Sequence, residues 1–165
     1  MGKIEFPNEV KNIINNPKSI VAVSTINEDG TPHVVYKGSV RILEDGNIAF
    51  IEVIENSRTT KNILSLINIE EDKKTKLIAM NILDAEKMLS YEIRLKFNRF
   101  AIEGPLWKSF LKETWKILPD IDPVGVWIFE PVEINNQSLP AKIKEEGERL
   151  EPRGNFWFKY LGRDL

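Results

Sequence analysis

The sequence predicts a mainly β fold with accessory α-helices, in which six antiparallel strands form a closed or partly closed barrel. Apolar and polar residues alternate in several short segments, as they do in half-buried strands. Two Asp-Gly turns connect the first three of these segments, and one helical pattern follows the third strand while another precedes the last. A chain of 165 residues is long enough to bury one core without disulfides.

The first half of the chain is predicted to form a short helix followed by a three-stranded antiparallel meander. Val10, Ile13 and Ile14 recur at helical spacing, and Pro17 ends that helix. Each of the two turns between the strands contains Asp-Gly, because glycine adopts the positive φ that a tight turn requires. The helix and the three strands are expected at residues 7–15, 20–26, 32–43 and 48–53.

After the third strand the apolar spacing changes to the helical period. Ile63 and Ile67 lie on one apolar stripe and Ser57 stands at the position of an N-cap, so an amphipathic helix is expected at 58–69. The charged residues 70–76 are expected to form a solvated loop. The remaining barrel elements are expected at 77–83 (strand), about 93–102 (strand), 106–118 (helix) and 124–134 (strand).

Residues 1–134 are predicted to form the barrel domain, and residues 135–165 a C-terminal tail. The tail is richer in polar residues, with a helix expected at 141–150 and an aromatic cluster at 156–160. The sequence contains no internal repeat and no low-complexity tract. One domain with a docked tail is therefore expected.

The composition excludes several kinds of chemistry. The chain has no cysteine, which excludes disulfides, thiol nucleophiles and thiolate metal sites. With one histidine, His33, it cannot build a multi-histidine metal site within one chain, and no metal is expected. The net charge of −2 provides no basic field for nucleic acid. The longest apolar run, Val124 to Phe129, is too short to cross a bilayer, and no signal peptide is evident, so a cytoplasmic protein without a membrane partner is expected.

Residues 56–62 are a candidate anion site at the junction of a strand and a helix. The free backbone N–H groups and the dipole at a helix start favour an anion. Arg58 and Lys61 add positive charge, and three hydroxyl side chains lie in the same segment. This combination suits a phosphate monoester, and the alternative is an ordinary capped helix start. The usual nucleotide motifs, GxGxxG and the P-loop, are absent.

Gly38 is a second anomaly, because it lies in the middle of the predicted second strand. A glycine weakens a strand unless something must approach its backbone closely. A phosphate at the helix start and a flat ring against this strand would explain both features. Glu52 interrupts the apolar third strand, and its simplest interpretation is an outward-facing position. His33 is interpreted as a surface or hydrogen-bonding residue that could also serve as an acid or base.

The order of these weak motifs resembles the FMN-binding split-barrel family, which is related to pyridoxamine 5′-phosphate oxidase. Residues 21–35 contain a strand, an Asp-Gly turn and a Pro-His-Val segment that resemble the opening of that family. The Ser57-Arg-Thr-Thr-Lys-Asn-Ile63 segment resembles its helix start, and Asp122-Pro-Val-Gly-Val-Trp127 its entry into the last barrel strand. The resemblance covers about residues 8–134.

The resemblance implies a six-stranded antiparallel split β-barrel that forms a homodimer, with FMN in a groove at the interface. The phosphate would lie at the helix start, where Asn62 anchors the helix, and the flavin along the predicted second strand with its edge near Glu52. The tail would dock on the same domain or on the dimer partner. The residues expected around FMN are Val35, Tyr36, Lys37, Gly38, Ser39, Glu52, Val53, Ser57, Arg58, Thr59, Lys61, Asn62 and Trp127.

The function that the resemblance implies is an FMN-dependent oxidoreductase or electron-transfer protein that acts on an unidentified small substrate. The alternatives are a non-catalytic flavin-binding module for sensing or storage, and a protein that uses deazaflavin or haem. The chain departs from the vitamin B6 oxidases, because Arg149-Leu-Glu-Pro152 precedes Trp157 instead of following it, and Thr59 replaces a common lysine. No catalytic residue is assigned.

Overall fold

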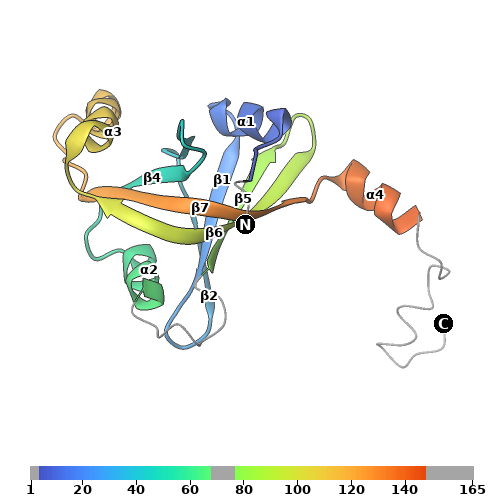
Figure 1. Cartoon of the computed structure of the whole chain (residues 1–165), viewed down its shortest axis with the longest axis horizontal. Coiled ribbons are helices and arrows are strands. Elements are labelled where there is room, and N and C mark those ends of the chain that lie inside the picture. Colours follow the sequence, from blue (N-terminus) through green and yellow to red (C-terminus); the bar gives the residue numbers. More distant parts are fainter. Residues whose placement is uncertain (1–3, 68–76, 148–165) are drawn as a thin grey trace.

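The computed structural model describes residues 4–67 and 77–147, where seven strands form one curled antiparallel sheet with four helices around it (Figure 1). The predicted loop at 70–76, the segment 149–152 and the aromatic cluster at 156–160 lie outside the described residues. The elements are α1 (Asn8–Asn15), β1 (Ile20–Ile26), β2 (Pro32–Tyr36), β3 (Arg41–Ile42), β4 (Ile48–Glu52), α2 (Arg58–Ile67), β5 (Leu77–Asp84), β6 (Leu89–Ala101), α3 (Gly104–Ile117), β7 (Gly125–Asn136) and α4 (Leu139–Gly147).

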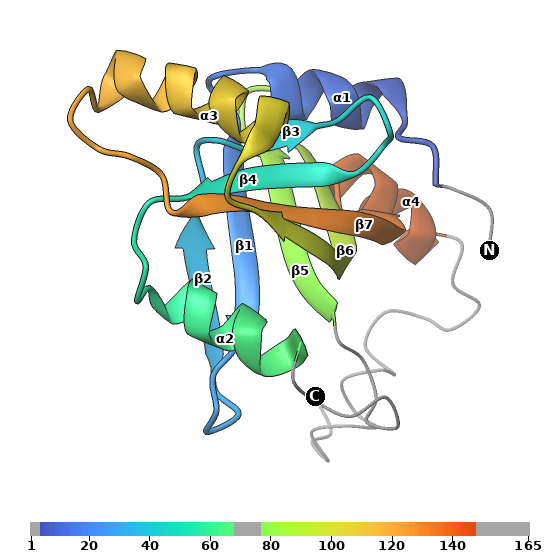
Figure 2. The same cartoon turned by 60° about the vertical axis from the view of Figure 1, so that its left-hand side comes forward.

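The strand order is β2-β1-β5-β6-β7-β4-β3, which places β2 and β3 at opposite edges of the sheet. These two strands are consecutive in the chain, so residues 37–40, here named the crossover, pass from one edge to the other. Figure 2 shows how the sheet permits this, because β4 and β7 run across the direction of β1 and β5. Irregular pairing of β6 with β7 at Arg94/Leu95 and Phe97/Arg99 accompanies the bend, as β-bulges do.

The mainly β prediction is confirmed, but the predicted strand at 32–43 is wrong. It is divided into β2 and β3, so the sheet has seven strands instead of six. The predicted meander is also wrong, because β2 pairs with β1 whereas β3 pairs with β4 at the far edge. Both Asp-Gly turns are formed, with φ of 82° at Gly30 and 77° at Gly46. The two Asp-Gly turns were therefore predicted correctly, but the division of the strand between them into β2 and β3 was not.

The core fills the inside of the curled sheet and is closed at one end by α1. Val10, Ile13 and Ile14 of that helix are buried, as the helical spacing predicts. Aromatic rings occupy the centre, and the rings of Phe50 and Phe129 stack with centroids 5.4 Å apart. Burying side chains of this size contributes about 1.5–3 kcal/mol each, so the core is the main source of stability.

Helix α4 follows β7, which runs to Asn136 and so extends slightly past the predicted limit of the barrel domain. Ser138 is buried before the helix starts, and its hydroxyl bonds to both backbone groups of Ser90. No residue of α4 is buried among the described residues. No helix in the described ranges is long and apolar enough to span a membrane.

Candidate functional site

The start of α2 is built by a short loop that leaves the end of β4. Ser57 caps the helix as predicted, because its Oγ accepts a hydrogen bond of 3.0 Å from the backbone N–H of Thr60. The backbone N–H of Lys61 donates to the carbonyl of Ser57 at 3.1 Å, which closes the first turn. That first turn contains no acidic residue, although acidic side chains are the ones favoured there.

One side of α2 is fixed to the barrel by a buried amide. The side-chain Nδ2 of Asn62 donates to Oγ1 of Thr25 at 2.8 Å and to Oδ1 of Asn27 at 3.0 Å. Both Thr25 and Asn62 are buried, so water does not replace these bonds easily. Asn62 therefore ties the helix to the end of β1 and to the turn that follows it.

The same face of α2 also presents exposed positive charge. Arg58 and Lys61 are exposed, and neither forms an ion pair with any residue in the described ranges. They border a hollow of about 480 Å³ between α2 and the β1–β2 turn. The residues that line it are Asn27, Glu28, Asp29, Arg58, Lys61, Asn62 and Ser65.

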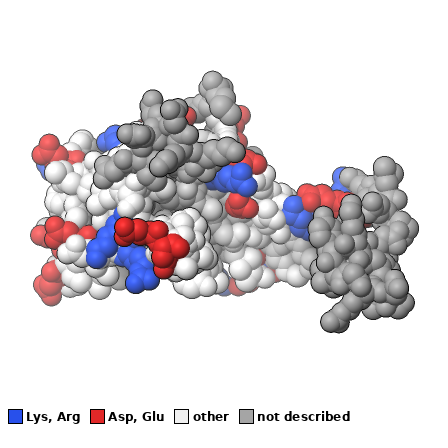
Figure 3. Space-filling view, turned by 90° about the horizontal axis from the view of Figure 1, so that it is seen from below, with Lys and Arg blue, Asp and Glu red and all other residues white. Residues whose placement is uncertain are grey.

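Acidic side chains of the β1–β2 turn face the same hollow. Seen from below, basic and acidic side chains lie beside each other on this side of the molecule (Figure 3). The pKa of Asp29 is lowered by hydrogen bonds from the side chain and backbone of Thr31, with a smaller contribution from the charge of Arg58. The carboxylate of Asp29 is therefore stabilised in its ionised form beside the cations of α2.

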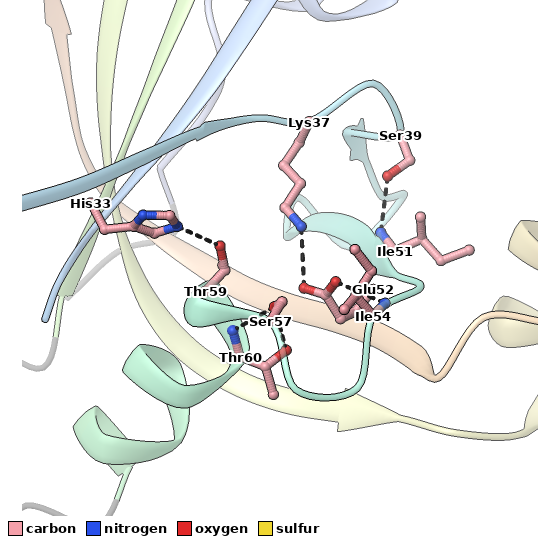
Figure 4. A network of polar contacts seen from close by, with 9 residues as sticks. All are labelled: His33, Lys37, Ser39, Ile51, Glu52, Ile54, Ser57, Thr59 and Thr60. Atoms are coloured by element: carbon pink, nitrogen blue, oxygen red, sulfur yellow. Dashed lines mark hydrogen bonds and ion pairs between the residues drawn. The ribbon is translucent and has the colours of Figure 1, made fainter.

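A second charged group lies inside the barrel, where the crossover passes β4 (Figure 4). Nζ of Lys37 lies 3.1 Å from Oε2 of Glu52, and these side chains are 13% and 3% exposed. The other carboxylate oxygen of Glu52 accepts a hydrogen bond of 3.2 Å from the backbone N–H of Ile54. The interpretation of Glu52 as an outward-facing residue is therefore wrong, since it is a buried ion-pair partner of a residue on the crossover.

Two further contacts join β2 and the crossover to the elements below them (Figure 4). Nε2 of His33 lies 3.2 Å from Oγ1 of Thr59, the second residue of α2, and Thr59 is buried. Oγ of Ser39 accepts a hydrogen bond of 3.1 Å from the backbone N–H of Ile51. The structure thus brings His33 to the helix start, a contact between residues far apart in sequence that the spacing of motifs could not predict.

The predicted cofactor residues divide into groups with different environments. One group gathers at the start of α2 and consists of Ser57, Arg58, Thr59, Lys61 and Asn62. A second group joins the crossover to β4 inside the barrel, where Lys37 bonds to Glu52 and Ser39 to the backbone of Ile51. Val35 and Val53 pack against the core, Tyr36 is 74% exposed, and a Cβ at Gly38 would meet nothing within 4 Å.

Trp127 is the predicted site residue that the structure does not bring to this region. It is 1% exposed and belongs to the core, where its ring centroid lies 4.2 Å from that of Phe100. Gly125 makes this contact possible, because a Cβ there would lie 2.3 Å from Cζ of Phe100. The Nε1 atom of Trp127 is buried without a hydrogen-bond partner among the described residues.

Sequence reasoning missed the contribution of the β1–β2 turn to the hollow. Asn27 and Asp29 line it from the turn, and Ser65 from the second turn of α2. The periodic spacing of Arg58, Lys61 and Ser65 on one helix face was the available signal. No group of three or more potential metal-ligating side chains occurs within residues 4–67 and 77–147.

Comparison with known proteins identifies the architecture. No protein-family model and no curated protein sequence matches the chain. Among solved structures, HupZ of Group A Streptococcus superposes with a TM-score of 0.63 at 22% identity, covering 82% of this chain and 96% of HupZ. An FMN-binding protein from Syntrophomonas wolfei has a TM-score of 0.61 at 13% identity, covering 78% and 84%. An F420 reductase has a TM-score of 0.59 at 17% identity, covering 79% and 98%.

The chain has the split-barrel fold. A Clostridium acetobutylicum protein of the pyridoxinephosphate oxidase family shares it, as the resemblance in the sequence predicts. Within the split barrel of this chain, His33 of β2 contacts the first turn of α2, whereas Val34 and Tyr36 point to the other face of the strand. The split barrel therefore places an exposed strand next to a cationic helix start.

Proposed function

We propose that this split-barrel protein binds FMN, with the phosphate at the start of α2 and the flavin along β2, and that it acts as an oxidoreductase or electron-transfer protein on a small substrate. The observation that carries the proposal is the pair of exposed cations at the helix start. Arg58 and Lys61 have no ion-pair partner among the described residues, although Glu28 and Asp29 line the same hollow. A phosphate monoester has the charge and the acceptor oxygens that this arrangement requires.

The energetics favour a ligand over a structural role for these cations. A positive side chain near a helix N-terminus opposes the helix dipole and costs about 0.3–1 kcal/mol when exposed. Two such side chains in the first turns of α2 therefore lower the stability of the free protein slightly. A bound phosphate reverses the sign of this interaction, because it is attracted to both side chains and to the dipole.

The edge strand β2 passes the start of α2 and offers a surface suited to a flat aromatic ring. On the outer side of β2, the face that points away from His33 and α2, Val34 is 59% exposed and Tyr36 74% exposed, and the small residues Ser24 and Ala22 are their register partners on β1. Beyond the strand, the space above Gly38 is open. A ring laid along this strand and covered by a second copy of the chain would bury apolar surface that is otherwise in water. This supports a homodimer with the cofactor at its interface.

When bound, FMN would supply the electron-transfer chemistry, and the protein would supply binding and orientation. The Lys37–Glu52 pair joins the crossover, which follows β2, to the end of β4 and so holds the crossover in place. A non-catalytic flavin-binding module for sensing or storage would use the same groove. The F420 reductase among the similar structures supports a deazaflavin as the second candidate cofactor.

The absorption spectrum and an FMN titration test the proposal. The purified protein is expected to show flavin bands, or in its apo form to quench the fluorescence of added FMN. Arg58→Ala is expected to weaken FMN binding by about 10- to 150-fold, since a charge-assisted hydrogen bond contributes about 1.5–3 kcal/mol. Lys142→Ala removes a positive charge on α4, no residue of which lines the hollow, and should leave the affinity unchanged. A protein that binds no FMN would contradict the proposal, and haem or deazaflavin bands would identify the alternatives.

The dimer is tested separately by a charge on the outer side of β2. Val34→Glu places a carboxylate where the partner would pack, so sedimentation velocity should show a monomer and FMN binding should weaken. Lys96→Glu alters an exposed residue of β6 and serves as the control. A wild-type protein that is monomeric with FMN bound would contradict the interface.

A further inference from the structure

We propose that His33 is a charge-bearing part of the phosphate subsite, so that FMN binds more tightly when this imidazole is protonated. The inference rests on the proposed function, because it takes the phosphate to lie at the start of α2. It assigns a role to a residue that the sequence motifs left outside the site. It also predicts that binding of the cofactor takes up a proton.

The position of His33 supports this role. The residue lies on β2, opposite Thr25 of β1, and its side chain reaches the first turn of α2. There Nε2 is 3.2 Å from Oγ1 of Thr59, and the ring is half-buried. The other ring nitrogen bonds to no residue in the described ranges. A protonated imidazole at this place adds one positive charge beside the N–H groups of the helix start.

The charges around His33 determine how it responds to a phosphate. Lys37, which follows the strand of His33, is neutralised by Glu52 of β4. Thr25, the β1 residue paired with His33, is uncharged. The other charged side chains of this region are Arg58 and Lys61 of α2 and Glu28 and Asp29 of the β1–β2 turn, which line the hollow beside the helix; His33 is not among its lining residues.

A phosphate dianion at the start of α2 places an opposite charge close to the imidazole, which favours its protonated form. An imidazole titrates between pH 5 and 8, so the linkage falls in an accessible range. Lowering the pH through this range should therefore strengthen FMN binding through His33.

Riboflavin separates the phosphate from the ring, because it carries the same ring without the phosphate. Its binding should show no linkage to His33. FMN has its own second phosphate ionisation near pH 6, which also changes affinity with pH. The His33→Gln variant keeps this ligand ionisation and removes the imidazole, so the difference between wild type and variant isolates the contribution of His33.

The test is an NMR titration of the imidazole protons in a preparation without a histidine tag. The chain has one histidine, so its signal needs no assignment. With saturating FMN, the titration midpoint of His33 should rise by about 1 pH unit or more relative to the free protein. With saturating riboflavin it should not change. Between pH 8 and 6, the wild-type affinity for FMN should increase several-fold more than that of His33→Gln.

The outcomes distinguish this inference from the proposed function. If FMN binds and the midpoint stays where it is in the free protein, the role of His33 is overturned while FMN binding stands. If riboflavin raises the midpoint as FMN does, the imidazole responds to the ring and not to a phosphate, which also overturns it. If neither compound binds at any pH, both proposals fail. The NMR experiment uses the wild-type chain, so it does not depend on the folding of the variant.

Discussion

Two pairs of charged residues near the junction of β4 and α2 differ in their exposure to solvent. Lys37 and Glu52 are buried and bonded to each other, so their charges cancel within the barrel. Arg58 and Lys61 are exposed, carry the same charge and have no ion-pair partner among the described residues. The comparison shows that the first pair holds the crossover in place, whereas the second is available to a ligand. Variants of the buried pair should therefore change the free energy of unfolding, and variants of the exposed pair should change the affinity for FMN.

The largest effect is expected from Glu52→Ala. The substitution leaves the ammonium group of Lys37 buried without its partner, and breaking a buried ion pair in this way costs about 3–5 kcal/mol. Urea denaturation should show a decrease of that size in the free energy of unfolding. The double variant Lys37→Met with Glu52→Leu removes both charges and should recover most of the loss. A decrease below about 1 kcal/mol for Glu52→Ala would mean that the pair is not buried as described.

Asn62→Ala is expected to have the next largest effect. It removes both hydrogen bonds that tie α2 to Thr25 and Asn27, and leaves the buried hydroxyl of Thr25 without this donor. The loss should be about 1–3 kcal/mol in the same denaturation experiment. Asn12→Ala changes an exposed amide on α1 and should stay within about 0.5 kcal/mol of wild type. Equal effects of the two substitutions would show that Asn62 does not anchor the helix.

Ser57→Ala is expected to cost about 1 kcal/mol, because it removes the side-chain acceptor that caps α2. Ser57→Thr keeps a hydroxyl acceptor and should restore most of the stability. Far-UV circular dichroism during thermal unfolding, together with the denaturant midpoint, measures the change. If alanine is as stable as threonine at this position, the cap contributes nothing and the helix start is held by Asn62 alone.

The smallest effect on stability is expected from Arg58→Ala. Arg58 is exposed and its charge opposes the helix dipole, so its removal should leave the free protein unchanged or slightly more stable. The same variant should lose FMN affinity, as proposed above. A stability loss comparable with that of Ser57→Ala would indicate a structural role for the guanidinium group. Arg58→Ala should therefore reduce FMN affinity without reducing stability, whereas Glu52→Ala should reduce stability.

The features that the sequence predicted correctly are those with a local cause. The cap at Ser57 follows from residue type, and the turns at Gly30 and Gly46 from their Asp-Gly dipeptides. The resemblance also predicted the fold, because several weak motifs occur along the chain in the order expected for that family, although each motif alone is unspecific.

The features that were missed depend on contacts across the sheet. The predicted strand at 32–43 contains Gly38, and the closure of the sheet breaks it at the crossover, so that Gly38 lies outside any strand. The burial of Glu52 depends on Lys37 reaching it from that crossover, and the proximity of His33 to Thr59 depends on how α2 packs beneath β2. Trp127 was expected near the cofactor but fills the core, since the continuous apolar run at 124–129 does not reveal which side of the curled sheet is inside.

The preference of the protein for FMN over riboflavin tests the central claim most directly. The two compounds share the flavin ring, so the ratio of their dissociation constants measures what the phosphate contributes. The wild-type protein should bind FMN at least about 100-fold more tightly than riboflavin, given two charge-assisted contacts. The double variant Arg58→Ala with Lys61→Ala should lose most of that preference and keep its riboflavin affinity. An unchanged preference in the double variant would contradict the assignment of the phosphate to the start of α2.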